Sequence, residues 1–174
     1  MLMTARLNLR KWTLHALDAD AWHEIWGDPE VIWWGPNPDR AKSVEQLQEI
    51  IERIEGMDPG LGWWALVDNK TGHICGNVCI QPSKAVDGHI EIGWHIMKRA
   101  QGSGFATEAA EALIAFAFER LDIERLVAPI VPTNEPSQRV AAKLGFARGE
   151  KLEYWGLEHD IWRLERSDFS VGAS

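Results

Sequence analysis

Two glycines follow a pair of cationic residues where the strongest helical pattern of the chain begins. The stretch KRAQGSGFATEAA contains Lys98, Arg99, Gly102 and Gly104. Glycine lets a ligand approach the backbone, and the unpaired N–H groups of a helix N-terminus attract anions such as phosphate. The loop lacks the Lys-Ser or Lys-Thr of a Walker sequence and the third glycine of a dinucleotide fingerprint. By itself, the stretch is compatible with an ordinary turn and with a phosphate site.

A second group of polar residues follows the next predicted strand. The sequence PTNEPSQRVAAKLGF, residues 132–146, places Asn134, Ser137, Arg139 and Lys143 on a short helix. Two adjacent strands that splay apart, one leading into the glycine loop and one into this helix, would open a cleft between them. A long ligand with a phosphate end could lie in that cleft, although Arg139 and Lys143 are equally compatible with a solvated helix face.

The strand before the glycine loop carries two groups that could move a proton. Alternation along GHIEIGWHIM puts Glu91 and His95 on one face and apolar side chains on the other. Carboxylates are rarely buried on a central strand without a purpose, which is either catalysis or a structural hydrogen bond or salt bridge. Asp160, in the last predicted strands, is a third candidate for a general base.

The elements that must position these residues follow from hydrophobic periodicity and turn chemistry. Strands are expected at residues 6–12, 63–68, 73–80, 88–97 and 124–131. Two more are expected near the end of the chain, one before and one after Gly156. Helices are expected after Asp18, after Ser43 with Gln46 as a capping box, at 104–121, and at 134–144 before Gly145. The strand–helix–strand passage around the third helix should be a right-handed crossover between parallel or splayed strands. The order predicts a mixed sheet with helices on both faces.

Composition narrows the class of protein. The chain has 174 residues, which fits a single domain over 1–174. A net charge of −8 argues against a general nucleic-acid binder, and no apolar run is long enough for a membrane span. Cys75 and Cys79 are interpreted as two buried thiols in a reducing cytoplasm, too far apart along a strand for a disulfide and too few for a metal site.

Together, these motifs resemble those of the Gcn5-related N-acetyltransferases (GNAT), and most closely those of their RimJ/RimL-like branch. The signatures TARLNLR, EIGW, GSGFATEAA and NEPSQRVAAKLGF occur in the expected order, over residues 4 to about 166. The resemblance implies an α/β (α+β) GNAT fold, with a mixed, mostly antiparallel, seven-stranded sheet, splayed central strands and about four helices on both faces. It implies a cytoplasmic N-acetyltransferase that uses acetyl-CoA and no metal, and it leaves a homodimer open.

The resemblance also implies a set of acetyl-CoA contacts. The pantetheine arm would lie along residues 94–98, the pyrophosphate would bind the N–H groups of 101–106, and Arg99 would lie nearby. Asn134 would bond the pantetheine, and Lys143 or Arg139 would reach the nucleotide phosphates. The implied contacts are Trp94, Ile96, Met97, Lys98, Arg99, Gln101, Gly102, Ser103, Gly104, Phe105, Ala106, Asn134, Ser137 and Lys143.

For the chemistry, the resemblance favours Glu91 as base, with His95 and Asp160 as alternatives. Many relatives use a tyrosine as acid, but the matching region here is Ala141-Ala142, so Ser137 is expected to donate a proton to the sulfur. The default role of such a serine is a surface or back-bonded position.

The acceptor would be a primary amine, either a protein N-terminus or a small molecule. Trp33 and Trp34, in a Gly/Pro loop, and His95 are the expected acceptor contacts, with the core edge as the alternative for the tryptophans. The competing function is an acyl-CoA-binding sensor or scaffold without catalysis.

Overall fold

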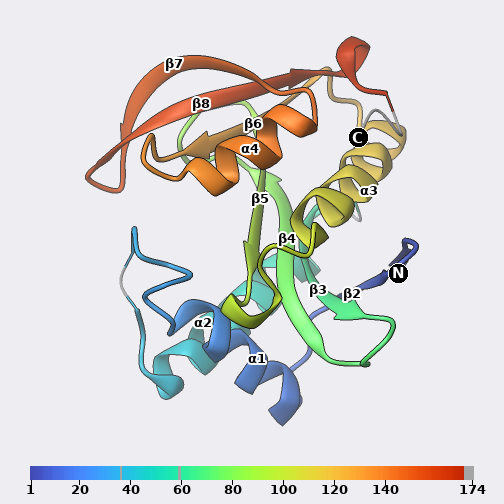
Figure 1. Cartoon of the computed structure of the whole chain (residues 1–174), viewed down its shortest axis with the longest axis vertical. Coiled ribbons are helices and arrows are strands. Elements are labelled where there is room, and N and C mark those ends of the chain that lie inside the picture. Colours follow the sequence, from blue (N-terminus) through green and yellow to red (C-terminus); the bar gives the residue numbers. More distant parts are fainter. Residues whose placement is uncertain (36, 59, 171–174) are drawn as a thin grey trace.

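A computed structural model describes residues 1–35, 37–58 and 60–170, and a single eight-stranded sheet runs through them (Figure 1). The strands are β1 (Leu2–Met3), β2 (Leu7–Lys11), β3 (Gly62–Asp68), β4 (Ile74–Pro82), β5 (Ile90–Ile96), β6 (Arg125–Ile130), β7 (Ala147–Tyr154) and β8 (Leu157–Glu165). The helices are α1 (Ala16–Trp26), α2 (Arg40–Glu55), α3 (Phe105–Arg120) and α4 (Glu135–Lys143). The strand absent from the seven predicted is β1, whose two residues are too few to show a period; it pairs with β2.

The sheet order is β1-β2-β3-β4-β5-β6-β8-β7, and within the described residues every neighbouring pair except β5–β6 is antiparallel. The parallel pair bonds only at Ile90↔Leu126 and Glu91↔Val127. Both strands continue beyond this short ladder, to Ile96 and Ile130. The predicted crossover through α3 and the splaying of the central strands are therefore confirmed.

Two apolar cores lie on opposite faces of the sheet. The larger core packs α3 and α4 against one face, and the smaller packs α1 and α2 against the other. The dipeptide Trp63-Trp64 shows the alternation directly, because Trp63 belongs to the smaller core and Trp64 to the larger. Both rings are buried.

The helix α3 is largely buried, as its apolar pattern predicted. Its fully or nearly fully buried residues are Ala109, Ala110, Leu113, Ile114, Ala117 and Phe118. Small alanines on the inner side let the helix lie close to the sheet. The start of α3 is consequently fixed relative to the ends of β5 and β6.

The first two helices begin earlier than predicted. Asp39, not Ser43, caps α2, because its carboxylate accepts a hydrogen bond from Lys42 N at 2.9 Å. Ser43 is buried inside the helix, where its hydroxyl donates to Asp39 O and lies 2.9 Å from Nδ1 of His23.

Asp18 is not the cap of α1 but lies buried in its first turn. Its carboxylate accepts hydrogen bonds from the guanidinium of Arg10 and from Thr13. Burial opposes ionisation of Asp18, but these donors outweigh it and hold the pKa below its ordinary value.

The last helix agrees with the sequence: Asn134 caps α4, and Gly145 follows its end with φ 86°.

Cys75 and Cys79 are free, buried thiols, and burial raises the pKa of Cys75 to about 11. Among the residues that the structure describes, no helix combines the length and apolarity needed to cross a bilayer.

Candidate active site

A cleft of about 1020 Å³ opens where β5 and β6 diverge. One half of its lining comes from the start of α3 and from α4, on one face of the sheet. The other half comes from α1, the loop after it, α2 and the turn between β7 and β8. The cleft therefore passes through the gap in the sheet, and its volume is large enough for two ligands that meet in the middle.

The glycine loop forms one wall of this cleft. Gly102 and Gly104 have φ values of 77° and 79°, in the left-handed region that side chains disfavour. Gly104 precedes α3 without a side-chain cap, and Phe105, Ala106 and Thr107 of the first helical turn line the cleft. The glycines are thus required by backbone conformation. The turn they make leaves the N-terminus of a 16-residue helix open to an anion.

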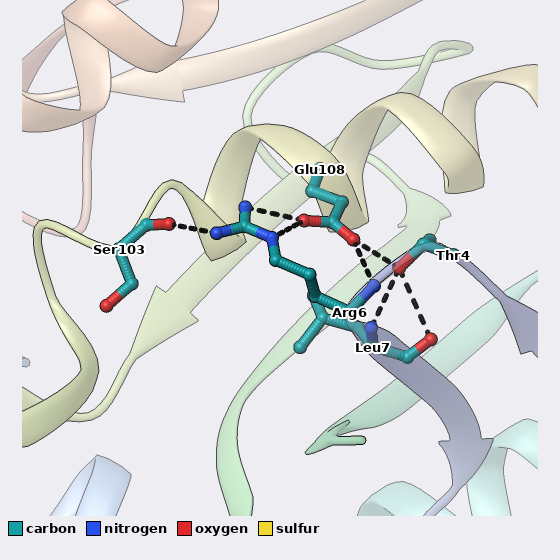
Figure 2. A network of polar contacts seen from close by, with 5 residues as sticks. All are labelled: Thr4, Arg6, Leu7, Ser103 and Glu108. Carbon is teal, nitrogen blue, oxygen red and sulfur yellow. Dashed lines mark hydrogen bonds and ion pairs between the residues drawn. The ribbon is translucent and has the colours of Figure 1, made fainter. Parts of the chain in front are cut away.

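The turn between β1 and β2 holds this loop in place (Figure 2). Arg6 donates to the backbone oxygen of Ser103 at 2.8 Å and to Glu108 of α3 at 2.6 Å. Glu108 also accepts from the Thr4 hydroxyl at 2.6 Å and from the Arg6 backbone N–H at 2.9 Å. Burial opposes ionisation of Glu108, but the hydrogen bonds from Thr4 and Arg6 prevail and lower its pKa. The TARL motif thus positions the loop from outside the cleft.

The cations near the loop are arranged differently from the prediction. Arg99 points toward α1, where its guanidinium lies 3.1 Å from Glu24 and donates to Ile74 O. Lys98 lies 2.9 Å from Glu30. Neither side chain lines the cleft, since both turn outward in the short 3₁₀ turn between β5 and the loop. Their predicted place beside the phosphates is not supported by these contacts.

Arg139 and Lys143 of α4 do line the cleft. They supply positive charge opposite the glycine loop. Asn134 and Ser137 line it too, and the Asn134 side chain accepts from the Ser137 backbone N–H at 3.2 Å. This cap keeps the first turn of α4, and with it the Ser137 hydroxyl, at the cleft wall.

Most of the remaining predicted ligand contacts also reach the cleft. Trp94, Ile96, Gln101 and Phe105 are among its lining residues. The side chain of Met97 is fully buried in the smaller core, between the sheet and the first two helices. It does not line the cleft. Ser103 does not line the cleft, and its backbone oxygen is held by Arg6.

Glu91 lines the cleft and is held by two neutral donors. Gln81 Nε2 donates to Oε1 at 2.8 Å, and the Ser83 hydroxyl donates to Oε2 at 2.8 Å. Ser83 Oγ also accepts from the N–H groups of Ala85 and Val86, so its proton is directed to the carboxylate. In the described part of the chain, no cationic side chain pairs with Glu91 within 4.0 Å.

The orientation of Gln81 follows from its other neighbours. Its Oε1 accepts from Trp63 Nε1 at 3.0 Å and from Arg53 Nη2 at 2.9 Å. An indole and a guanidinium can only donate, so the amide oxygen must face them and the amide N–H must face Glu91. This relay fixes the carboxylate beside the Trp63 ring.

His95 shares the face of Glu91, as alternation predicted, and lies among aromatic rings. Its ring centroid is 4.9 Å from Trp26 and 6.0 Å from Trp63, with the Trp63 ring inclined by only 5°. Its Nδ1 lies 3.2 Å from the side chain of Asn77. Burial lowers the pKa of His95 to about 4, so the imidazole is neutral at neutral pH.

Asp160 is not in the cleft. It is fully buried and pairs with Arg148 at 2.6 Å. Its partner in the sheet is Ile130, which packs in the larger core, so Asp160 faces α3 and α4 rather than α1 and α2. The alternative that made Asp160 the base does not fit this placement.

Three residues near the last turn line the cleft although the sequence did not predict them: Tyr154, Trp155 and His159. Burial, together with the charge of Glu91, raises the pKa of Tyr154 to about 12, so its hydroxyl stays protonated. His159 Nδ1 lies 3.0 Å from Leu157 O, which can only accept, so Nε2 carries the lone pair in the neutral ring. Register places Tyr154 and His159 on one face of the hairpin, and Trp155 lies in its turn. Which face reaches the cleft depends on the sheet order.

Trp33 and Trp34, the predicted acceptor contacts, both line the cleft. Trp33 is 46% exposed, and Trp34 stacks on Trp155 with centroids 5.4 Å apart. Trp34 also meets the edge of Trp26 at 6.2 Å. Aromatic rings from three separate elements thus surround one end of the cleft.

Comparison with known proteins agrees with this geometry. The family model of the Acetyltransferase (GNAT) domain matches residues 6–147. "Uncharacterized N-acetyltransferase p20" of Bacillus licheniformis is 30% identical over 149 residues, covering 84% of this chain and 82% of that protein. YdaF of Bacillus subtilis (strain 168), named as a candidate ribosomal N-acetyltransferase, is 33% identical over 139 residues, 75% of this chain and 72% of that one.

A solved structure shows the same fold. RimL, described as a ribosomal L7/L12 alpha-N-protein acetyltransferase in complex with coenzyme A, superimposes with a TM-score of 0.73 at 18% identity, over 93% of this chain and 95% of that one. The match over residues 6–147 and the curated relatives establish the family. The chain belongs to the GNAT acetyltransferases, in their RimJ/RimL-like branch, and is an acetyl-CoA-dependent N-acetyltransferase.

Proposed function

We propose that this enzyme acetylates a primary amine that enters the half of the cleft near α1 and α2. Acetyl-CoA would occupy the half near α3 and α4. The observation that carries this proposal is a continuous cleft whose lining includes an open helix N-terminus, the Ser137 hydroxyl and the Glu91 carboxylate. One cleft therefore combines a group that binds an anion, a group that donates a proton and a group that accepts one, as acetyl transfer from a thioester requires.

The residues of the first half fit acetyl-CoA. The uncapped start of α3 offers N–H groups to the pyrophosphate, and Arg139 and Lys143 offer charge from the opposite wall. A side chain at Gly102 would project into the open space above the loop, which is where the phosphates would lie. When bound, acetyl-CoA supplies an activated acyl group on sulfur.

The edge of β5 supports both the pantetheine arm and the oxyanion. Met97 N–H bonds Cys75 O at 3.0 Å and so faces β4. Successive peptide groups of a strand point to opposite edges, so the N–H groups of Trp94 and Ile96 face the gap toward β6. Gln101 already donates to Ile96 O at 3.1 Å. The Trp94 N–H remains as the donor for the negative charge that develops on the carbonyl oxygen.

Glu91 would accept the proton that the amine loses as its nitrogen attacks the carbonyl. Its two neutral hydrogen-bond donors fix the carboxylate without cancelling its charge. His95 suits this role less, because a pKa of about 4 makes its ring a weak proton acceptor at neutral pH. The neutral ring instead forms part of the acceptor wall.

Ser137 would donate its hydroxyl proton to the departing sulfur and regain one from solvent. In the balanced reaction, a C–N bond forms, the C–S bond breaks, and the proton lost by a neutral amine is matched by the proton gained by the thiol. An amine that arrives as an ammonium ion releases its additional proton to solvent through Glu91.

The test is thiol release from acetyl-CoA with a panel of amines and peptides. Glu91→Gln and Ser137→Ala should each lower kcat by about 10- to 1000-fold and leave acetyl-CoA binding intact, because each removes a single proton-transfer group. Glu52→Gln is the control, since it removes an exposed carboxylate of α2 that does not line the cleft.

An unchanged rate in either variant would remove that residue from the mechanism. Binding of acetyl-CoA without turnover of any amine would instead favour the non-catalytic sensor.

The free, buried thiols suit a reducing compartment, and the cytoplasm is the location we propose.

A further inference from the structure

The turn between β7 and β8 carries a tryptophan where the backbone favours asparagine or glycine. Trp155 has φ 53° and Gly156 has φ 73°. Within the described residues, Trp155 alone among the non-glycine residues has a positive φ. Asn-Gly is the favoured pair for a two-residue hairpin turn of this kind, and a bulky side chain is disfavoured there. An observed outlier of this sort points to a function for the side chain.

The ring of Trp155 lies over the mouth of the cleft. It is 57% exposed, and it stacks on Trp34 at 5.4 Å with an interplanar angle of 27°. On its own strand it stacks on Tyr154 at 5.0 Å and 25°. Trp34 belongs to the loop between α1 and α2, so the stacked pair joins two distant parts of the chain across the mouth.

Below this pair, the cleft wall includes a cluster of aromatic rings, although charged side chains, among them Glu49 and Arg53, also line the cleft. Trp26 lies 5.7 Å from Trp63, and both rings contact His95. The imidazole is neutral at neutral pH, so it presents a ring rather than a cation. A flat apolar group would exchange water contacts for ring contacts on several sides.

The polar end of this space is the carboxylate of Glu91. Gln81 links it to the Trp63 indole through hydrogen bonds of 2.8 and 3.0 Å, so the carboxylate and the ring wall are adjacent. A carboxylate held by neutral donors attracts an ammonium group. The ring wall and Glu91 therefore match the two ends of an amine attached to an aromatic group.

We propose that the acceptor is a small arylalkylamine, whose ring lies among Trp26, Trp34, Trp63 and Trp155 and whose amino group lies at Glu91. This inference rests on the proposed acetyl transfer and specifies its acceptor. A peptide is the less suitable occupant. The Trp34–Trp155 pair would have to part to admit an extended chain.

The first experiment compares matched acceptors at saturating acetyl-CoA. 2-Phenylethylamine should show a kcat/KM about tenfold above that of 2-cyclohexylethylamine and of hexylamine, because stacking of its ring on the aromatic wall should raise kcat/KM by roughly tenfold. The puckered ring of the cyclohexyl amine is thicker and cannot stack in this way. Spermidine and a short peptide with a free N-terminus represent the other classes of amine.

The second experiment uses Trp155→Asn, which removes the ring and gives the turn its preferred residue. We expect an unfolding midpoint equal to or above that of the parent, and a loss of about tenfold in the ratio of kcat/KM for the phenyl over the cyclohexyl amine. Trp155→Phe should retain part of that ratio. Leu17→Ala, an exposed apolar residue of α1 outside the cleft, is the control and should change neither quantity.

A direct readout independent of turnover is calorimetric binding of 2-phenylethylamine to the CoA-saturated protein. Tight binding that Trp155→Asn weakens supports the inference. Equal kcat/KM for the phenyl and cyclohexyl amines, an unchanged ratio in Trp155→Asn, or a preference for the peptide would overturn it and leave acetyl transfer intact. Absence of thiol release with every amine would overturn both the inference and the proposed function.

Discussion

Glu91 illustrates how neighbouring side chains prepare a single residue for its role. Gln81 and Ser83 must donate to the carboxylate, because their oxygens are already occupied by obligate donors. No proton needs to move and no side chain needs to turn before an amine arrives. The same principle separates Glu91 from Asp160, whose carboxylate is neutralised by Arg148 on the other face of the sheet.

His95 gives a testable pH dependence at this scale. Its pKa is lowered from 6.5 to about 4 by burial, so the unfolded chain binds a proton there that the folded protein does not. Stability from His95 is therefore complete above about pH 6.5 and is lost as the pH falls toward 4, by up to about 3 kcal/mol. His95→Phe keeps a ring but cannot titrate, and should flatten this part of the curve of unfolding free energy against pH.

Chemical denaturation at a series of pH values measures the effect. His73→Gln is the matched control, because it removes an exposed histidine and should leave the slope unchanged. Parallel curves for His95→Phe and the parent would show that the imidazole of His95 is not held neutral by the fold.

At the scale of elements, the glycine loop depends on a strand far away in the sequence. Arg6, next to the start of β2, ties Ser103 of the loop to Glu108 of α3 (Figure 2). The strength of charge-assisted hydrogen bonds explains why a partly exposed arginine can order the loop. The loop geometry is therefore a property of β2, the loop and α3 together.

Arg6→Ala should weaken acetyl-CoA binding about three- to tenfold, because the loop loses both anchors while its glycines remain. Isothermal titration with acetyl-CoA measures the change. Arg10→Ala is a matched control on the neighbouring strand β2, since Arg10 pairs with Asp18 of α1. It should lower the unfolding midpoint and leave acetyl-CoA affinity unchanged, and a similar loss of affinity in both variants would argue against a specific anchor.

The elements also show where local sequence signals succeed. The pattern of α3 and the Asn134 and Gly145 boundaries of α4 are local, so they could be predicted. The starts of α1 and α2 could not, because Asp18 and Ser43 resemble caps by type. Tertiary contacts with Arg10 and His23 use those side chains instead. The strand β1 was missed for lack of length.

At the scale of the molecule, a net charge of −8 favours a cationic acceptor over the anionic cosubstrate. This accounts for the need for local charge from Arg139 and Lys143 at the cosubstrate half. The half near α1 and α2 is lined by three carboxylates and two cations: Glu30, Glu49, Glu91, Arg53 and Lys84. Among the described residues, none of the ion pairs involves Glu91. The two halves of the cleft thus differ in electrostatic character.

Raising the salt concentration from about 0.02 M to about 0.5 M should lower kcat/KM for a cationic amine about threefold to tenfold, because screening removes the attraction. Steady-state assays at saturating acetyl-CoA test this. Glu91→Gln should show a shallower salt dependence in its residual activity. An increase of kcat/KM with salt would contradict an electrostatically attracted acceptor.

The sequence by itself predicted the local features of the half of the cleft that we assign to acetyl-CoA. Its signals are local: glycines that permit positive φ, a helix that follows them, and a short capped helix that carries Ser137. Such features depend on neighbours within a few residues, so their types and spacing are sufficient. Alternation is equally local, and it is enough to place Glu91 and His95 on the same face of β5.

Only the tertiary structure decided the acceptor side. Trp34, Glu91 and Trp155 are separated by more than fifty residues at each step, and they meet because β8 lies between β6 and β7 at one end of the sheet. The outward turn of Arg99 and the placement of Asp160 on the opposite face depend on the same packing. Periodicity can assign a side chain to a face of its own strand, but strand order and splaying determine which faces enclose a ligand.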